Sequence, residues 1–305
     1  MRRLCYLSFA SLLIDMADFK ERKWEGVRPP KDSAGLHFLY NCFIGRAFLR
    51  ILSSRFISKL VGAFMDSRLS KPLIKSFVSK NKIDLSQFES DDFKCFNDCF
   101  CRKIKDGMRP ISPDTNALIA PCDGLLSAYK LNGEEVLPIK QSEYTLSSLL
   151  KNDALVKQFE NGICLVFRLC VTHYHRYCYP ITGYKNDNIF IKGKLHTVRP
   201  IALRRFPVFT ENCREYTLIE SKEFGKLLQM EVGAMLVGKI KNLHGAGFVE
   251  RGAEKGMFLY GGSTVVLLLE NNKVEISEDV FVNTESGLET PVYMGECIGF
   301  STKKE

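Results

Sequence analysis

The pattern of apolar and polar positions along the chain changes character near residue 110. Between residues 38 and 82, apolar residues recur at spacings near three to five, which indicates helices. The recurring positions are Phe43, Ala47, Ile51, Phe56 and Ile57. The aromatic and basic spacing of residues 91–111 predicts one more helix, which ends before Pro110.

After residue 110, short apolar runs alternate with turns rich in Gly, Pro and Asn, and these runs are typical of strands. The runs are ALIAPCDG, ICLVFRLCVT, NIFIKGKLHTV, LLQMEVGAMLVGKI and MFLYGGSTVVLLLE. Helices first and strands later predict an α+β protein. We expect a helical region at 1–110, followed by a β-rich barrel or sandwich body at 111–305 that carries the chemistry.

The first residues of the chain look superficially like a targeting segment, because Arg2 and Arg3 precede an apolar run from Leu4 to Ile14. Eleven residues are too few to cross a bilayer, which takes about 20 in a helix. No small-x-small cleavage site follows the run. We therefore expect an interfacial anchor or a helix docked on the body.

The net charge of +8 is concentrated in the helical region. Residues 44–82 carry nine basic side chains, opposed only by Asp66. Basic amphipathic helices with Phe, Ile and Leu on the other face suit an anionic membrane surface. The alternative is the solvated face of ordinary core helices. No nucleic-acid-binding motif accompanies the charge, so we do not expect a nucleic-acid partner.

An apolar share of 45% and a charged share of 26% are those of a folded globular protein. The eleven cysteines are odd in number and scattered, which favours reduced thiols in a cytosol-facing protein. Cys95, Cys99 and Cys101 lie close together, but no second ligand pair and no nearby histidine accompany them. Helix packing explains them better than a metal site, and we expect no metal.

Two glycines precede Ser263, and a strongly β-forming run follows it. Glycine tolerates backbone conformations that other residues avoid, and it leaves the carbonyl of Gly262 accessible. The Ser263 hydroxyl can attack this carbonyl and convert the amide to an ester. Elimination then breaks the chain and leaves dehydroalanine, which hydrolyses to a pyruvoyl group. The ordinary alternative is a turn that leads into a buried strand.

Asp123 ends an apolar run, where a carboxylate can orient a histidine, although an Asp-Gly turn explains it equally well. His173 and His175 end another run and share a face of an extended segment. Histidine suits proton transfer near neutral pH, and a metal site that includes Cys178 is the alternative. His196 follows a third run, from which it can face the same cavity.

The order of these features resembles that of the phosphatidylserine decarboxylases. The matching stretches run from about residue 91 to the end and include FKCFNDCFCRKIKDGMRPI, APCDG, FRLCVTHYHRYCYP, KGKLHTV and RGAEKGMFLYGGSTVVLLLE. The resemblance implies removal of the carboxylate of phosphatidylserine, which gives phosphatidylethanolamine and carbon dioxide. It also implies a proenzyme that cuts itself between Gly262 and Ser263 into a β chain (1–262) and an α chain (263–305). The α chain then begins with a pyruvoyl group made from Ser263.

The family's relay for self-cleavage consists of an aspartate, a histidine and the serine, and Asp123 and Ser263 match two of these positions. Many members carry a YHRxH pattern whose second histidine is assigned to the relay. Here that position is Cys178, so the sequence departs from the pattern. His175 matches the first histidine and is the predicted base. His173, Cys178 and His196 remain as possible bases or supporting residues.

The resemblance further implies phosphatidylserine in a membrane as the partner, peripheral attachment at the inner face of the cell membrane, and paired α and β chains that can dimerise again. Three rival functions stay open. A pyruvoyl decarboxylase of a soluble amino acid would use the same chemistry without a membrane region. A Ser-His-Asp hydrolase would need the G-x-S-x-G elbow, which is absent here. A non-enzymatic, membrane-bound β-barrel module would use GGST as a turn.

Overall fold

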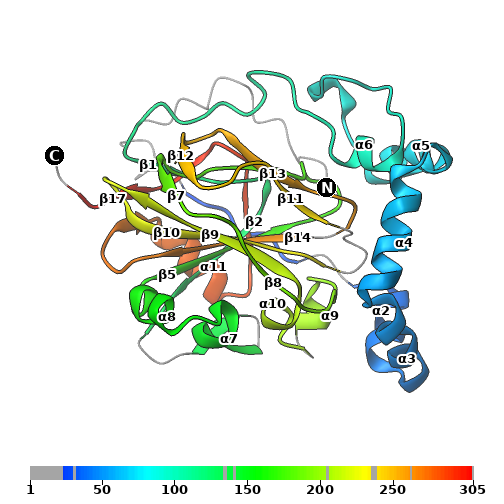
Figure 1. Cartoon of the computed structure of the whole chain (residues 1–305), viewed down its shortest axis with the longest axis horizontal. Coiled ribbons are helices and arrows are strands. Elements are labelled where there is room, and N and C mark those ends of the chain that lie inside the picture. The colour runs from blue at the N-terminus through cyan, green and yellow to red at the C-terminus, as the bar shows by residue number, and fades with distance from the viewer. Residues whose placement is uncertain are drawn as a thin grey trace.

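The computed structural model describes residues 23–29, 32–132, 136–139, 142–203, 206–234, 239–261 and 263–303. The expected apolar segment Leu4–Ile14 and the residue Gly262 lie outside these ranges. In Figure 1, helices α2 to α5 form a column along one side of a β-rich body. The predicted α+β organisation is confirmed, because helices come first and antiparallel sheets follow.

The helical pattern expected over 38–82 is divided into separate helices: α2 (Ala34–Asn41), α3 (Phe43–Leu52), α4 (Arg55–Asp66), the short 3-10 helix η2 (Arg68–Ser70) and α5 (Pro72–Asn81). Serine caps explain two of the starts. Ser33 and Ser54 accept backbone hydrogen bonds from the first turns of α2 and α4. The helix α5 begins at Pro72 and ends at Asn81, and the following cap residue, Lys82, has a left-handed φ of 51°.

The helix expected over 91–109 is much shorter than predicted, because α6 covers only Phe96–Phe100. Beyond it, the chain is extended, and the backbone amides of Glu89 and Lys105 pair with the carbonyls of Lys103 and Gln87. These bonds, next to the 3-10 helix η3 (Leu85–Gln87), replace the helical ones. The aromatic spacing that suggested a helix belongs instead to side chains that pack against the body.

The main sheet of the body is antiparallel and has nine strands among the described residues. Eight strands run in the order β12 (Gly247–Val249), β7 (Gly183–Lys185), β9 (Arg214–Ser221), β10 (Gly225–Val232), β14 (Ser263–Leu269), β5 (Ile163–Leu169), β2 (Gly124–Lys130) and β16 (Thr290–Val292). The ninth, β8 (Ile189–Ile191), pairs with β9. Most of the apolar runs in the sequence therefore form strands, as predicted.

Smaller sheets complete the body. One has the order β11 (Ile240–Asn242), β13 (Glu254–Phe258) and β6 (Arg176–Cys178), and another has the order β1 (Ala117–Ile119), β17 (Cys297–Ser301) and β15 (Val274–Ile276). The strands β3 (Val136–Ile139) and β4 (Ser142–Thr145) form a hairpin. Helices α7 (Leu146–Leu150), α8 (Asp153–Phe159), α9 (Pro200–Leu203), α10 (Val208–Glu211) and α11 (Glu278–Glu285) lie around the sheets.

Strand β14 lies inside the main sheet, between β10 and β5, and each of its seven residues is buried. Such a continuous apolar run is expected for a strand that is covered on both faces. Among the helices that the structure describes, none is both long and apolar enough to cross a membrane.

Candidate active site

Ser263 is the first residue of β14 and is fully buried. It pairs with Leu169, the last residue of β5, at one end of the sheet. Its hydroxyl is buried and has no hydrogen-bond partner among the residues that the structure describes. A buried hydroxyl without a partner costs free energy on the order of 1–3 kcal/mol, so such a group is a candidate for chemistry.

The segment before Ser263 crosses from one sheet to another. Strand β13 belongs to the three-stranded sheet with β6 and β11, whereas β14 belongs to the main sheet. The described part of this crossover is residues 259–261. Gly261 has a φ of +130°, a conformation that favours glycine. The described residues just before the predicted cleavage site therefore belong to a short connection between two sheets.

His175 lies just before β6, and its ring is completely buried. Its Nδ1 lies 2.8 Å from the carbonyl oxygen of His173. Because a carbonyl only accepts, Nδ1 carries the proton and Nε2 has a free lone pair. Nε2 is buried and has no hydrogen-bond partner among the described residues. Burial, followed by the charges of His173 and Arg102, lowers the pKa of His175 well below its usual value, so the ring is uncharged at neutral pH and Nε2 carries no proton.

The Asp123 carboxylate is held by Arg109, not by a histidine. Arg109 donates from Nε to Oδ1 at 2.8 Å and from Nη2 to Oδ2 at 2.6 Å. The backbone amide of Met294 donates to Oδ1 at 2.9 Å. Both side chains are largely buried. The two hydrogen bonds at Oδ1 use both of its lone pairs. Oδ2 accepts one described hydrogen bond and therefore has one lone pair left for a further donor.

His173 is the histidine that Asp123 influences most directly. Burial lowers its pKa, and the charge of Asp123 is the largest opposing effect. Its Nδ1 accepts a hydrogen bond from the Cys170 amide at 3.1 Å. The carbonyl of His173 in turn orients His175. The described hydrogen bonds connect neither Asp123 to His175 nor His175 to Ser263, so the three predicted relay residues are near one end of the sheet without being bonded to one another.

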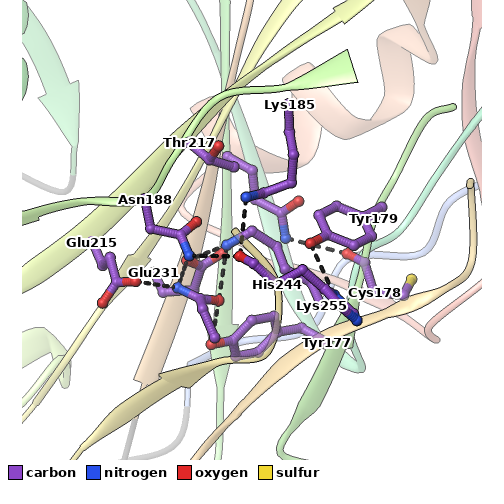
Figure 2. Close-up of polar contacts among 12 residues, drawn as sticks. Tyr177, Cys178, Tyr179, Lys185, Asn188, Glu215, Thr217, Glu231, His244 and Lys255 are labelled. Atoms are coloured by element: carbon purple, nitrogen blue, oxygen red, sulfur yellow. Dashed lines mark hydrogen bonds and ion pairs between the residues drawn. The ribbon is translucent and has the colours of Figure 1, made fainter. Parts of the chain in front are cut away.

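Cys178, at the position where relatives of the resembled family carry a histidine, is a buried and uncharged thiol. Burial raises its pKa to about 12. Its Sγ has only a long contact of 3.9 Å to the Ala120 carbonyl. Figure 2 shows Cys178 beside a buried polar cluster centred on Glu231 and Lys255, whose charged atoms lie 2.6 Å apart. A neutral thiol in this setting is poorly suited to act as a base.

His196 lies apart from these groups, in the loop after β8. Its ring stacks on Phe206 at 4.5 Å and approaches Tyr40 of α2, and its Nε2 lies 3.5 Å from Glu211. Burial is the main cause of its lowered pKa, and the Glu211 charge opposes it. Its described contacts join the helical region to the body, and none of them reaches Ser263.

The Cys95, Cys99 and Cys101 group packs as expected for ordinary cysteines. Cys99 is fully buried, and the Cys101 thiol donates to the Phe258 carbonyl at 3.2 Å. Within the described ranges, no three His, Cys, Asp or Glu side chains are arranged to hold a metal ion.

The sequence reasoning missed several charged or polar residues of this region. Arg168 on β5 forms a buried ion pair with Glu289, with 2.9 Å between Nε and Oε1. Arg109, Glu231 and Lys255 were not selected either. The available signal was a charged residue within an otherwise apolar run, because such a residue is buried only when it is paired.

The residues around Ser263 fit a pyruvoyl group formed in place. Conversion of the Ser263 hydroxyl would break none of the described hydrogen bonds, because the hydroxyl makes none of them. Gly261, which has a positive φ, lies two positions before Ser263 in the sequence. The neighbouring imidazole of His175 is neutral, and the ring of Phe100 covers it at 3.9 Å between centroids. A group at this position would be shielded from water.

Comparisons with known proteins agree with this geometry. The family model described as phosphatidylserine decarboxylase matches residues 96–300. Phosphatidylserine decarboxylase proenzyme 2 of Clostridium acetobutylicum is 40% identical over 290 residues, which cover 95% of this chain and 98% of that protein. The proenzyme of Clostridium botulinum strain Hall is 43% identical over 270 residues (87% and 92%). That of Clostridium tetani is 38% identical over 291 residues (93% and 98%).

Proposed function

Because the chain belongs to the phosphatidylserine decarboxylase family and is a carboxy-lyase proenzyme, we propose that it matures by cutting itself between Gly262 and Ser263. Ser263 then supplies the pyruvoyl group that the family uses. The substrate is phosphatidylserine, and the products are phosphatidylethanolamine and carbon dioxide.

One observation supports this proposal above the others. The Ser263 hydroxyl and the His175 Nε2 are both buried, and within the described part of the chain neither has a hydrogen-bond partner. One is a proton donor, and the other has a free lone pair. Strand pairing puts Ser263 beside Leu169 at the end of β5, and the following loop carries the histidine. A movement that joins the two groups would satisfy both and would generate the nucleophile.

Self-cleavage then follows from the chain's own atoms. His175 takes the proton of Ser263, and the hydroxyl oxygen attacks the Gly262 carbonyl, so that the amide becomes an ester. Removal of the α-proton of Ser263 expels the carboxylate of Gly262 and leaves dehydroalanine. Water adds, ammonia leaves, and the α chain begins with a pyruvoyl group.

Asp123 serves in this proposal as a fixed negative charge near the histidine loop. Its bidentate bond to Arg109 and its bond to the Met294 amide restrict its rotation. Its charge favours a protonated imidazole at His173, whose carbonyl holds His175. Asp123 therefore stabilises the positive charge that develops when a histidine accepts the serine proton.

In turnover, the pyruvoyl group supplies a carbonyl that accepts the electrons released when the substrate carboxylate leaves. His175 is the proposed donor of the proton that replaces the carboxylate. The Phe100 ring packed against His175 at 3.9 Å between centroids would help to exclude water from that position. Because burial lowers the pKa of His175, the ring releases a proton readily after it has taken one up.

The two chains stay together after cleavage in this proposal. Strand β14 of the α chain lies between β10 and β5 of the β chain. Strands β16 and β17 of the α chain pair with β2 and β1. The buried Arg168–Glu289 pair and the bond from Met294 to Asp123 also cross the cut. Whether this pair of chains dimerises again remains a prediction from the sequence.

The helical region is proposed to hold the enzyme at the membrane surface, as a peripheral protein on the inner face of the cell membrane. Large apolar side chains of α3 and α4 are exposed: Phe43 by 80%, Ile44 by 60% and Phe56 by 69%. The basic residues of the same region favour anionic lipid by about 1 kcal/mol each near the surface. The boundary of this region at residue 110 also remains a prediction.

Intact-mass measurement of the purified protein tests the proposal. Two chains are expected, corresponding to residues 1–262 and 263–305, with a pyruvoyl group at the start of the smaller one. Ser263→Ala is expected to stay as one chain and to lack activity. A wild-type protein that remains uncut, or a Ser263→Ala protein that still yields a fragment ending at Gly262, would refute self-cleavage.

A comparison of substrates separates the proposal from its nearest rival. Carbon dioxide release is expected from phosphatidylserine in vesicles and not from free serine. Borohydride is expected to inactivate the mature enzyme, because it reduces the pyruvoyl carbonyl. Equal turnover of free serine would favour a decarboxylase of a soluble amino acid.

A further inference from the structure

The crossover that leads to the cleavage site is held by three different parts of the chain. The amide of Phe258 donates to the His175 carbonyl at 3.0 Å, and that of Leu259 donates to the Lys239 carbonyl at 3.1 Å. The amide of Tyr260 donates to Oδ1 of Asn97 at 2.9 Å. The first two bonds come from the body. The third comes from a side chain of α6, on the helical side of the molecule.

Burial and a hydrogen bond to Asp66 hold the Asn97 side chain in place. It is 4% exposed. Its Nδ2 donates to Oδ1 of Asp66, the last residue of α4, at 2.8 Å. The two bonds fix the orientation of the amide, because only its oxygen can accept from Tyr260 and only its nitrogen can donate to a carboxylate. A continuous chain of hydrogen bonds therefore runs from α4 through Asn97 to the residue two positions before Gly262.

The same short helix also touches the proposed base. Phe100, one turn after Asn97, packs against the ring of His175 in a tilted arrangement, with 3.9 Å between centroids. The ring of Tyr260 packs edge-on against Phe96 and Phe100, with centroids 5.0 and 5.5 Å apart. Helix α6 thus contacts the base on one side and the crossover on the other.

We propose that Asn97 is a positioning residue for self-cleavage: its bond to the Tyr260 amide, oriented by Asp66, fixes the end of the crossover that leads into Ser263. The inference rests on the proposed self-cleavage before Ser263. Only Gly261 separates Tyr260 from Gly262, so an error in the position of Tyr260 passes almost directly to the attacked carbonyl. A displacement of about 1 Å at a reacting atom is enough to slow a reaction on the order of 100-fold.

The first test measures the rate of self-cleavage after cell-free synthesis, as the fraction of cut chain over time. Asn97→Ala removes the acceptor for Tyr260 and is expected to slow cleavage by a factor on the order of 10 to 100. Asn81→Ala is the matched control. Asn81 also lies in the helical region and donates from its side chain to a backbone carbonyl, that of Phe77, at 2.8 Å. It has no described contact with the crossover, so the control is expected to cleave at the wild-type rate.

The second test exchanges the two partners. Asn97→Asp keeps an oxygen for the Tyr260 amide but sets a carboxylate against Asp66, so cleavage is expected to slow. In the double variant Asn97→Asp/Asp66→Asn, the new amide at 66 donates to the new carboxylate, and the rate is expected to recover to within about threefold of wild type. Asp66→Asn alone keeps an acceptor at 66 and is expected to have a small effect. A merely structural asparagine would not show this reciprocal rescue.

Thermal unfolding of each variant, measured in the uncut Ser263→Ala background, separates cleavage from folding. The inference holds if Asn97→Asp slows cleavage without changing the melting temperature, and if adding Asp66→Asn to that variant restores the cleavage rate. It is overturned if Asn97→Ala cleaves as fast as Asn81→Ala, or if the double variant is as slow as Asn97→Asp. A wild-type chain that never cuts would overturn the proposed function itself, which is a distinguishable result.

Discussion

The helical region and the β-rich body treat apolar and charged side chains in opposite ways. On α3 and α4, large apolar side chains such as Phe43 and Phe56 face outward, whereas on β14 every residue is buried. Charged groups show the reverse. Lys71 and Asp92 pair at the exposed surface of the helical region, but Lys255 and Glu231 pair in the interior of the body. The helical region leaves large apolar side chains at its surface, and the body encloses both its apolar side chains and its charge pairs.

Helix α6 does not fit either description. It belongs to the helical region by sequence, yet Asn97 and Phe100 are buried against the crossover and His175. The difference between the two regions therefore indicates that the chain changes its role at α6. The outward-facing helices end before α6, and the part that shapes the site begins there. The family model also begins at residue 96.

The largest expected effect is on the body, at the proposed base. His175→Ala removes the free lone pair at Nε2 and is expected to slow self-cleavage by about 100-fold or more, since general-base catalysis contributes roughly 10²–10⁴. Cleavage over time on a denaturing gel measures this. Cys178→Ser is the control and is expected to cleave within about threefold of wild type. A fast His175→Ala with a slow Cys178→Ser would transfer the role of base to Cys178.

The second prediction concerns the charge pairs that only the body buries. Glu289→Ala leaves Arg168 without its buried partner and is expected to cost about 3–5 kcal/mol of unfolding free energy. Urea unfolding of the uncut Ser263→Ala chain measures it. Lys71→Ala breaks an exposed pair with Asp92 and is expected to cost less than about 1 kcal/mol. Equal losses in the two variants would remove the contrast between the regions.

The third prediction concerns the outward apolar face. Phe43→Ser is expected to weaken binding to vesicles of anionic lipid about tenfold, because the buried part of a phenyl ring contributes roughly 1–2 kcal/mol. Self-cleavage is expected to stay unchanged. Val282→Ser on α11 of the body, where Val282 is 51% exposed, is the matched control and is expected to bind vesicles as wild type does. Flotation with liposomes measures the binding of both variants. A loss of binding in Val282→Ser alone would assign the membrane contact to the body and not to the helical region.

The smallest expected effect is a pH dependence of stability. Burial lowers the pKa of His175 below the ordinary value of 6.5, so the unfolded chain binds a proton at a pH where the folded chain does not. Stability from this group is therefore present above pH 6.5 and falls as the pH drops below it, by up to about 1.4 kcal/mol per pH unit. Urea titrations of the Ser263→Ala chain at pH 7 and pH 5.5, with and without His175→Phe, isolate the effect. A difference that His175→Phe leaves unchanged would assign it to other groups.

The sequence predicted the order of helices and strands because the hydrophobic period differs between them. It overestimated the helix near residue 91, because the bonds that replace it come from Gln87 and Lys103 and depend on tertiary pairing. Local patterns selected Asp123, His175 and Ser263 as candidates, and their roles in one reaction came from the resemblance to a family. The Asp123 partner, Arg109, was not found, because nothing in the local pattern shows which distant carboxylate an arginine will meet. Asn97 was missed for the same reason, since its partner Tyr260 lies 163 residues away.

The position of β14 inside the sheet has a consequence for the life of the enzyme. The precursor folds as one chain. A short connection links β14 covalently to the strands it pairs with, so its effective concentration next to them is high. In the proposed maturation this connection is cut, and the strand can then return after global unfolding only by a collision between two molecules. Refolding of the mature enzyme thus becomes second order and slows on dilution, whereas refolding of the Ser263→Ala precursor does not. In this proposal the cut enzyme does not readily refold once it has unfolded. Its lifetime is therefore governed by its rate of unfolding.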